Sequence, residues 1–563
     1  MFDDADNFAD IFRGGLPYCL LIALPILILC TPAALASDLQ VQRMAQFDIN
    51  GVSLGCRASA ISLEAKSLYT WSTGRHCVLA RLLDISVNDF NKIRQKAGGL
   101  IVLLPNNLLA LSDEAKEQVN ALEQAMLTQA VPVPVYFSAP NKYLEQIVDD
   151  ITHTIDDNGS KKQNDTAIAQ LFLSISANGY QVTVSGANAV ANKNSKISVI
   201  QGELLSNQYV PKRMEGTDDY NNLPVILITA NLKTFGIYND YPLNADAAIL
   251  MGLIELFSKL HSVISTTPKY RLVFLLSESG VLLNFQGSKK WLDDNVVLQN
   301  VEFVLCLDTI TQSLAYNQQN VMYMHVSKPP KEKSSISNFF KLLKLAAGEH
   351  VENVTVEGVH KKINLADTQL AWEHERFSMK RYPAFTLSSV KNPRSPMRTS
   401  MFKDNEARII SQTLTSAKII AEALASYIYN IDQYAGIFDG HIEINEEIIQ
   451  PYLGVKSVLQ NSDIKDGFEK YLKNVKIIYD KPDAREPDFM FYEGHDAKLN
   501  VYRVKPAVFD LFLTFVIALY LSIVYFVIQY FPKFYDVVSK FTKAEPSTQL
   551  NGNYSERVKT KVN

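Results

Sequence analysis

The chain is 563 residues long and has a formal net charge of −4 at pH 7. It contains no basic patch interleaved with aromatic residues, no zinc-knuckle spacing and no glycine-rich phosphate loop, which argues against direct nucleic-acid binding. Five cysteines in a chain of this length exclude a disulfide scaffold, so the folded part must bury a hydrophobic core of its own.

Region 1–36 is predicted to be a signal peptide. Its apolar stretch Leu16–Cys30 is too short to cross a bilayer comfortably, and Ala34, Leu35 and Ala36 form the small-x-small pattern of a signal-peptidase site. Four aspartates and a single arginine precede the apolar stretch, a composition that leaves an uncleaved membrane anchor as the alternative.

Three cysteines, Cys56, Cys77 and Cys306, follow this region. We expect at most one disulfide among them. Cys56 with Cys77 is the favoured pair, because Cys306 lies in the apolar strand candidate VEFVLCLD.

Region 37–221 is predicted to be a mixed α+β lumenal unit. Helical periodicity predicts helices near 113–128 and 141–154, and short apolar runs between turn residues predict strands. The strand candidates are QFDI, HCVLARLLDI, GGLIVLLP, VPVYFS and YQVTVSG.

Region 222–431 has the regular pattern of an α/β domain. Near-continuous apolar strands alternate with amphipathic helices, which predicts a largely parallel sheet sandwiched between helices. The predicted strands are Val225–Ala230, Arg271–Ser277, Val301–Leu307, Tyr323–Ser327 and Ala384–Leu387. The predicted helices are Ala247–His261, a segment from Gly287, Ile336–Ala347 and Asp404–Tyr429.

The C-terminal part predicts a membrane anchor. Region 432–506 is more polar and is predicted to be mainly helical, whereas region 507–531 contains an uncharged apolar run long enough for one transmembrane helix. The tail, 532–563, has six basic and three acidic residues, which favours the cytoplasmic face. The sequence therefore predicts a single-pass type I protein with most of its mass in the lumen.

Three glycan acceptors lie on the predicted lumenal side. Asn158, Asn164 and Asn353 each begin an Asn-x-Ser/Thr sequence. The first two lie in the polar stretch DDNGSKKQNDT, which we expect to be an exposed loop. Asn553 also matches, but the predicted topology places it in the cytosol, where it would stay unmodified.

Ligands of open α/β sheets bind beyond the carboxyl ends of the strands. Several segments there, in this order and spacing, resemble the zinc aminopeptidase-like fold shared by transferrin receptor and nicastrin: ITANLKTFG, LNADAAILMGLIELFSKL, LVFLLSESGVLLNFQGSKKWLDDN and VLCLDT. Within that fold, NLADTQLAWEHERFSMKRYPAFTLS and YRVKPAVFDLFL resemble the nicalin family. The similarity extends from near Val41 through the predicted span.

This resemblance implies a zinc site that has lost most of its ligands. Active relatives hold two zinc ions between carboxylates and imidazoles, and a glutamate acts as general base. Here Asn231 and Lys233 occupy the His-x-Asp step, Val281 and Leu282 replace the Glu-Glu pair, and Ser389 stands near the final histidine position.

Two carboxylates remain near the expected site. Asp246 is interpreted as a helix cap, with a displaced metal ligand as the alternative. Asp308 stands where a third-strand ligand is expected, and we expect it to accept hydrogen bonds from local backbone amides. Glu278 could replace the missing base only through a rearranged turn. We therefore expect no catalytic residue, metal or cofactor.

Glu373, His374 and Glu375 form another acidic and imidazole cluster. It lacks the His-Glu-x-x-His spacing that aligns two imidazoles on one helix face. We expect its charges to form ion pairs or a partner surface while Trp372 and Phe377 pack inside.

The resemblance implies a non-catalytic scaffold subunit in the endoplasmic reticulum membrane. Its implied partners are a Nodal modulator-like lumenal protein, a small multi-spanning membrane protein, and the Sec61 translocon with its ribosome, in an assembly that helps multi-pass proteins insert. Two alternatives stay open. One is a residual zinc aminopeptidase using a rebuilt ligand set such as Asp246, Glu278, Asp308 and a distant histidine, and the other is a nicastrin-like receptor for peptides.

Overall fold

The computed structural model describes most of the chain in ranges separated by gaps. These ranges are 36–57, 59–107, 111–159, 179–185, 189–204, 223–234, 236–237, 243–262, 270–294, 300–311, 320–349, 354–400, 406–455, 457–458, 462–483, 485–504 and 507–542. One compact unit comprises Ala36–Ser160 and Tyr180–Tyr502, and the C-terminal helix belongs to a second unit. Residues 1–35 of the predicted signal peptide lie outside the described residues.

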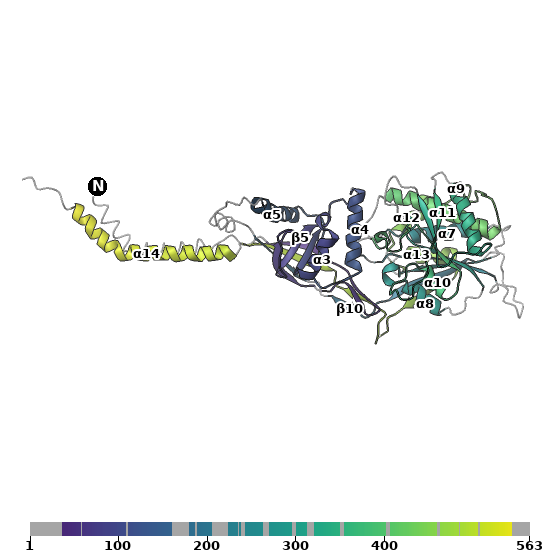
Figure 1. Cartoon of the computed structure of the whole chain (residues 1–563), viewed down its shortest axis with the longest axis horizontal. Coiled ribbons are helices and arrows are strands. Elements are labelled where there is room, and N and C mark those ends of the chain that lie inside the picture. The colour runs from purple at the N-terminus through teal and green to yellow at the C-terminus, as the bar shows by residue number, and fades with distance from the viewer. Residues whose placement is uncertain are drawn as a thin grey trace, which may run out of the picture. The chain divides into compact units, whose positions relative to one another are not determined.

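An eight-stranded sheet forms the centre of the α/β part (Figure 1). From one edge to the other its strands are β16 (Thr355–His360), β15 (Val321–Val326), β17 (Ala384–Ser388), β14 (Val301–Leu307), β12 (Val225–Asn231), β13 (Arg271–Ser277), β11 (Ile197–Leu204) and β18 (Lys473–Asp480). Four of its seven pairings are parallel, including the central run from β17 to β13. The predicted largely parallel sheet is confirmed.

Helices cover both faces of this sheet, as the near-continuous apolar strands require. On one face, alternate strand residues such as Ile226, Phe274 and Leu305 pack with α7 (Ala245–Ser262), α9 (Ser335–Gly348), α11 (Glu406–Tyr429), α12 (Glu446–Leu453) and α13 (Ser462–Tyr471). On the other face, Leu227, Val273 and Val304 pack with α8 (Gln286–Asp294) and α10 (His374–Met379).

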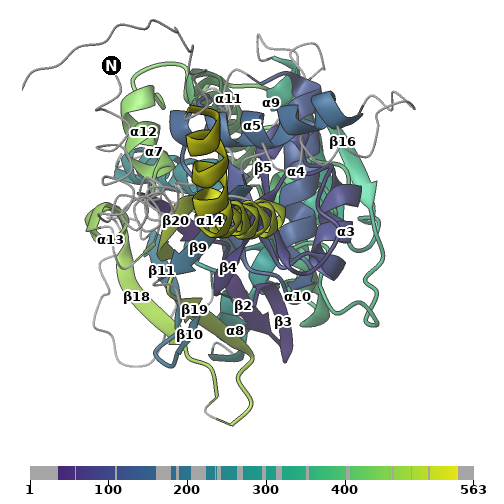
Figure 2. The ribbon, with the colours of Figure 1, turned by 90° about the vertical axis from the view of Figure 1, so that its left-hand side faces the viewer.

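The N-terminal part contains a closed barrel. Around the barrel the strands are β1 (Ala36–Arg43), β20 (Asp496–Val504), β9 (Gly179–Ser185), β4 (Ile61–Lys66), β5 (His76–Arg81), β6 (Gly99–Leu103) and β8 (Val135–Ser138), several of which are labelled in Figure 2. Closure removes the free edges that an open sheet would expose.

Helices and a smaller sheet complete this part. The helices are α3 (Val87–Lys96), α4 (Asp113–Leu127), α5 (Lys142–Gly159) and the short η1 (Leu82–Asp84). The five-stranded sheet has the order β10 (Val190–Asn192), β19 (Phe489–Glu493), β2 (Gln46–Ile49), β3 (Val52–Cys56) and β7 (Ala130–Val131). Two short 3-10 helices, η2 (Val281–Leu283) and η3 (Pro396–Arg398), lie in the α/β part.

Region 432–506 is not mainly helical, and that prediction was wrong. It contains α12 and α13, but then β18, β19 and β20, which join three different sheets. The strand signal of β18 is hidden in the sequence because this strand forms a sheet edge, where its lysines face solvent. The eight-stranded sheet also extends beyond the expected limits 222–431, since β11 and β18 both lie outside them.

The three described cysteines are buried and form no disulfide with one another. Cys56 packs among the residues around α3 and α4, whereas Cys77 packs against α5 in a different cluster. Burial raises the pKa of the Cys77 thiol well above its usual range. The pair favoured from the sequence is therefore not joined.

The C-terminal helix α14 (Ala507–Thr542) covers the predicted span 507–531 and continues past Pro532. Among the described residues it is the one helix long and apolar enough to cross a membrane, over Leu511–Lys533. Of the predicted glycan acceptors, Asn158 lies in the last turn of α5, so the loop expected there was wrong for this residue. Asn164 and Asn353 lie outside the described residues.

Candidate functional site

A small pocket lies at the carboxyl ends of β12 and β14. Its lining comes from five places: the end of β12, the first turn of α7, the η2 turn, the end of β14 and η3. The cavity volume is about 40 Å³. That is room for about three water molecules.

The structure brings the predicted site positions together here. Six of the seven line the pocket: Asn231, Lys233, Asp246, Val281, Leu282 and Asp308. The seventh, Ser389, lies beside it and donates its hydroxyl to the carbonyl oxygen of Thr309 at 2.6 Å. Residues from five separate segments thus converge at the edge of the sheet formed by the carboxyl ends of its strands.

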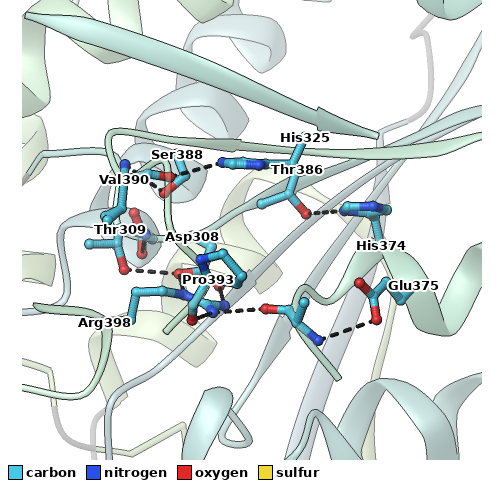
Figure 3. A network of polar contacts seen from close by, with 12 residues as sticks. Asp308, Thr309, His325, His374, Glu375, Thr386, Ser388, Val390, Pro393 and Arg398 are labelled. Atoms are coloured by element: carbon cyan, nitrogen blue, oxygen red, sulfur yellow. Dashed lines mark hydrogen bonds and ion pairs between the residues drawn. The ribbon is translucent and has the colours of Figure 1, made fainter. Parts of the chain in front are cut away.

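Asp308 forms a buried ion pair with Arg398, which the sequence analysis missed (Figure 3). The guanidinium donates to both carboxylate oxygens, from Nε at 3.2 Å and from Nη2 at 2.5 Å. The side chain of Arg398 is 1% exposed and that of Asp308 is 9% exposed. The expected bonds to local backbone amides were wrong, because a cation 90 residues further along the chain satisfies this carboxylate instead.

Arg398 is itself fixed on all sides. Its Nη1 donates to the carbonyl oxygens of Ala371 at 2.8 Å and Pro393 at 2.6 Å. Its guanidinium lies 4.0 Å from the ring centre of Trp372, which in turn stacks on His325 at 3.9 Å. An arginine that is bidentate and stacked in this way is held in one position, so its displacement by a metal cation would cost free energy.

Asp246 is not a cap of its own helix. Its two oxygens accept hydrogen bonds from the backbone amides of Thr309 at 2.6 Å and Ile310 at 3.0 Å, so it holds the turn that follows β14. The cap interpretation was wrong because the donors come from the loop after β14, which is distant from Asp246 in the sequence. Burial raises the pKa of Asp246, the charge of Asp308 adds to this, and the two backbone amides oppose it.

Lys233 brings a second cation to the pocket. Its Nζ donates to the carbonyl oxygen of Met397 at 3.3 Å. Partial burial lowers the pKa of the Lys233 ammonium, whereas the carboxylates of Asp246 and Asp308 raise it. The backbone nitrogen of Lys233 donates to Asn244 Oδ1 at 2.7 Å, which fixes the chain direction after β12. Two cations therefore face two carboxylates around the cavity.

Val281 and Leu282 form the η2 turn on another wall of the pocket. Neither can accept a proton or hold a cation. Glu278, the suggested substitute base, does not line the cavity. Its carboxylate accepts hydrogen bonds from the amide of Ser198 at 3.0 Å, the hydroxyl of Ser457, and the amide of Val458 at 2.6 Å. It ties β11 to the segment after α12.

The Glu373, His374 and Glu375 cluster is buried, so the expected ion pairs and partner surface were wrong. Glu373 is 0% exposed and accepts hydrogen bonds from Thr229 Oγ1 at 3.0 Å and Ser288 Oγ at 2.5 Å. Burial raises the pKa of Glu373 to about 7, which these two hydroxyls oppose. The predicted packing of Trp372 and Phe377 is confirmed, since both are fully buried.

The donor set does not fit a pair of zinc ions. Two carboxylates remain, and one is paired with an arginine while the other accepts two backbone amides. Among the described residues there is no group of three or more His, Cys, Asp or Glu side chains that could hold a metal ion. Zinc sites in proteins use at least three such ligands.

Comparison with known proteins gives the family. No protein-family model matches the chain. The human protein BOS complex subunit NCLN is 35% identical over 562 residues, which cover 93% of this chain and 96% of the relative. The Caenorhabditis elegans protein Nicalin is 24% identical over 579 residues, which cover 93% and 96%. The chain belongs to the nicalin family.

Nicalin-family membership agrees with the fold. The crystal structure of the gamma-secretase component nicastrin superposes with a TM-score of 0.51 at 12% sequence identity, covering 82% of this nicalin-family chain and 99% of that chain. At this identity the match shows the fold alone. The predicted α/β fold, shared with nicastrin, is confirmed.

Proposed function

We propose that this nicalin-family chain is a non-catalytic scaffold subunit of a membrane protein complex. Its relatives at 34% and 35% identity are named subunits of the BOS complex. The helix α14, with the apolar stretch Leu511–Lys533, supplies a candidate anchor. A folded body of this size in one chain with a single anchor suits a protein that holds other proteins in place.

The observation that carries the proposal is the internal charge balance of the pocket. Lys233 and Arg398 occupy the neighbourhood where metal charge would be needed, and they face Asp246 and Asp308. Water activation needs a Lewis acid or a general base with a free lone pair. Here one carboxylate is committed to a guanidinium and the other to backbone amides, and the base position is aliphatic.

The finer proposal follows the resemblance. The chain would be a single-pass type I protein of the endoplasmic reticulum, with glycans at Asn158, Asn164 and Asn353. Its partners would be a Nodal modulator-like lumenal protein and a small multi-spanning membrane protein at the Sec61 translocon. The complex would support insertion of multi-pass proteins.

The two alternatives have less support. A rebuilt zinc site would need Glu278, whose carboxylate is bound to three donors elsewhere. A peptide receptor would need a groove, and no contact of the described residues at this small pocket points to a bound peptide. Neither alternative gains a specific observation in its favour.

The test uses the full-length protein purified in mild detergent. We expect well below one zinc per chain by elemental analysis, no cleavage of amino-acid amides, and stoichiometric recovery of other membrane proteins. An active zinc aminopeptidase assayed in parallel serves as the control for metal retention. Two zinc ions per chain with chelator-sensitive cleavage would overturn the scaffold proposal, and so would recovery of the chain alone.

A further inference from the structure

The C-terminal helix α14 is longer than a membrane span requires. It has 36 residues, which make about 54 Å of helix at a rise of about 1.5 Å per residue. A hydrocarbon core is about 30 Å thick and takes about 20 helical residues. The apolar stretch of α14 ends at Lys533. The terminal segment 533–542 of this helix therefore extends beyond the core that the apolar stretch would cross.

The terminal segment does not continue the direction of the span. Figures 1 and 2 show that α14 bends towards its C-terminal end. Pro532 lies inside the helix, directly before the terminal segment. A proline inside a helix has no N–H for the backbone hydrogen bond and clashes with the carbonyl four residues earlier, which bends the helix. Such a bend lets the terminal segment turn from the axis of the span towards the plane of the membrane.

The terminal segment is amphipathic. At about 100° of rotation per residue, the helical positions of its large apolar residues fall within an arc of about 100°. These residues, which we call the apolar stripe, are Phe534, Val537, Val538 and Phe541. The charged residues and the serine occupy an arc of about 120° on the opposite side. They are Lys533, Asp536, Ser539 and Lys540. This division into two sides is typical of a helix that lies in a membrane interface.

The terminal segment begins at the level expected for lipid headgroups. Lys533 Nζ lies 5.4 Å from the ring centre of Tyr530. Tyrosine and lysine at the end of an apolar span are typical of the boundary between acyl chains and headgroups. Val537 is the residue of the apolar stripe whose burial the structure describes, and it is 49% exposed. The described part of the chain therefore leaves this side chain uncovered next to the membrane boundary.

The charge of the tail fits an anionic surface. Region 532–563 has six basic and three acidic residues. Basic residues next to a span are attracted to anionic lipid headgroups, and the attraction falls off within a Debye length of the membrane. Lys533 and Lys540 belong to the terminal segment itself, so they lie close enough to contribute.

We propose that the terminal segment 533–542 is an interfacial helix, which lies on the bilayer that α14 crosses. Its apolar stripe faces the acyl chains, and its lysines contact anionic headgroups. The occupant of the stripe is lipid, because the stripe directly continues a helix that is itself apolar enough to sit in lipid. A protein that covers the same stripe is the competing occupant, which the experiment separates.

This inference rests on the proposed function in one respect, since it needs α14 to cross a membrane. It goes beyond that function by assigning a second membrane contact, and a lipid chemistry, to the tail. Extraction with alkaline carbonate tests the anchor separately. If the wild-type chain is extracted from native membranes, the anchor and the interfacial helix both fail. A chain that resists extraction but has a uniformly water-exposed tail sinks the interfacial helix alone.

The experiment places single cysteines along the terminal segment of the full-length chain and measures their rates of reaction with a membrane-permeant maleimide. Cysteine reacts as the thiolate, which forms poorly away from water. Val538→Cys reports on the apolar stripe, and its neighbour Ser539→Cys is the matched control on the polar side. The wild-type chain, whose described cysteines are buried, gives the background.

The purified chain alone is placed in vesicles of phosphatidylcholine and phosphatidylserine. We expect Val538→Cys to react about tenfold or more slowly than Ser539→Cys. Phe534→Cys and Asp536→Cys form a second pair and should differ in the same way. Rates within about twofold of each other in both pairs would overturn the interfacial helix.

The same variants in native membranes separate lipid from protein. We expect a similar ratio of rates there. Protection of Val538→Cys that is present in native membranes and absent in the vesicles would mean that a protein covers the stripe, and would overturn the proposal. Vesicles without phosphatidylserine should lower the ratio by about threefold or more. A ratio that ignores phosphatidylserine would contradict the contact between the lysines and anionic headgroups.

Pro532→Ala tests the bend. Alanine restores the backbone donor, so the helix should straighten and lift the apolar stripe from the membrane surface. We expect the reaction of Val538→Cys to become about threefold or more faster in this background, while Ser539→Cys stays as it was. An unchanged ratio of the two rates would contradict the positioning role of Pro532.

Discussion

Replacing Arg398 by methionine tests how the pocket at the strand ends is held together. Methionine fills much of the same volume but removes the cation from a pair whose side chains are 1% and 9% exposed. Leaving one charge of a buried pair without its partner costs about 3–5 kcal/mol. The carbonyl oxygens of Ala371 and Pro393 also lose their donor, and the stacking on Trp372, about 1 kcal/mol, disappears.

We therefore expect Arg398→Met to lower the free energy of unfolding by about 4 kcal/mol. Arg398→Met combined with Asp308→Asn removes the stranded charge as well, and should recover about 2 kcal/mol of that loss. The control is Lys418→Met, which breaks the partly exposed ion pair with Glu443 at 2.8 Å and should cost less than about 1 kcal/mol.

The assay is denaturant unfolding of the full-length protein in detergent, followed by tryptophan fluorescence, because Trp372 lies against the substituted side chain. The slope of the transition must stay the same for the comparison to hold. A loss below about 1 kcal/mol, or a double variant no more stable than the single one, would refute the view that Arg398 neutralises the buried carboxylate of Asp308.

Two further predictions concern a buried acid and the glycans. Burial raises the pKa of Glu373 to about 7 from an ordinary value of 4.5, so this group favours the folded state at low pH and loses that contribution as pH rises from about 4.5 to 7. The free energy of unfolding of wild type should therefore fall between about pH 5 and pH 8, whereas that of Glu373→Gln lacks this contribution. Relative to wild type, the variant should become more stable by about 2–3 kcal/mol over this range in denaturant unfolding. Parallel pH profiles of the two proteins would contradict this. Substituting Asn158, Asn164 and Asn353 by Gln one at a time should each remove one endoglycosidase-sensitive mobility step, with Asn553→Gln as the silent control, and a step lost at Asn553 would reverse the predicted topology.

The α/β core was accessible from the sequence because its strands are buried on both faces and read as continuous apolar runs. Strands β12, β13, β14 and β17 fall within a residue or two of their predicted limits. The edge strand β18 was not accessible, because half of its side chains face solvent and give no hydropathy signal. The barrel was hidden for another reason: β1 and β20 are neighbours in space although hundreds of residues separate them in the chain.

The features of the candidate site likewise fall into those that the sequence determined and those that only the tertiary structure decided. The sequence alone determined which residue types stand at the strand ends, including the aliphatic Val281 and Leu282, and that an apolar helix follows the folded body in the chain. Only the tertiary structure decided how the remaining charges are paired: Asp308 with Arg398, and Asp246 with the amides after β14. The physical reason is that the position of a buried strand follows from the local hydropathy of the sequence. The partner of a buried charge depends instead on long-range packing, which brings segments distant in the chain into contact.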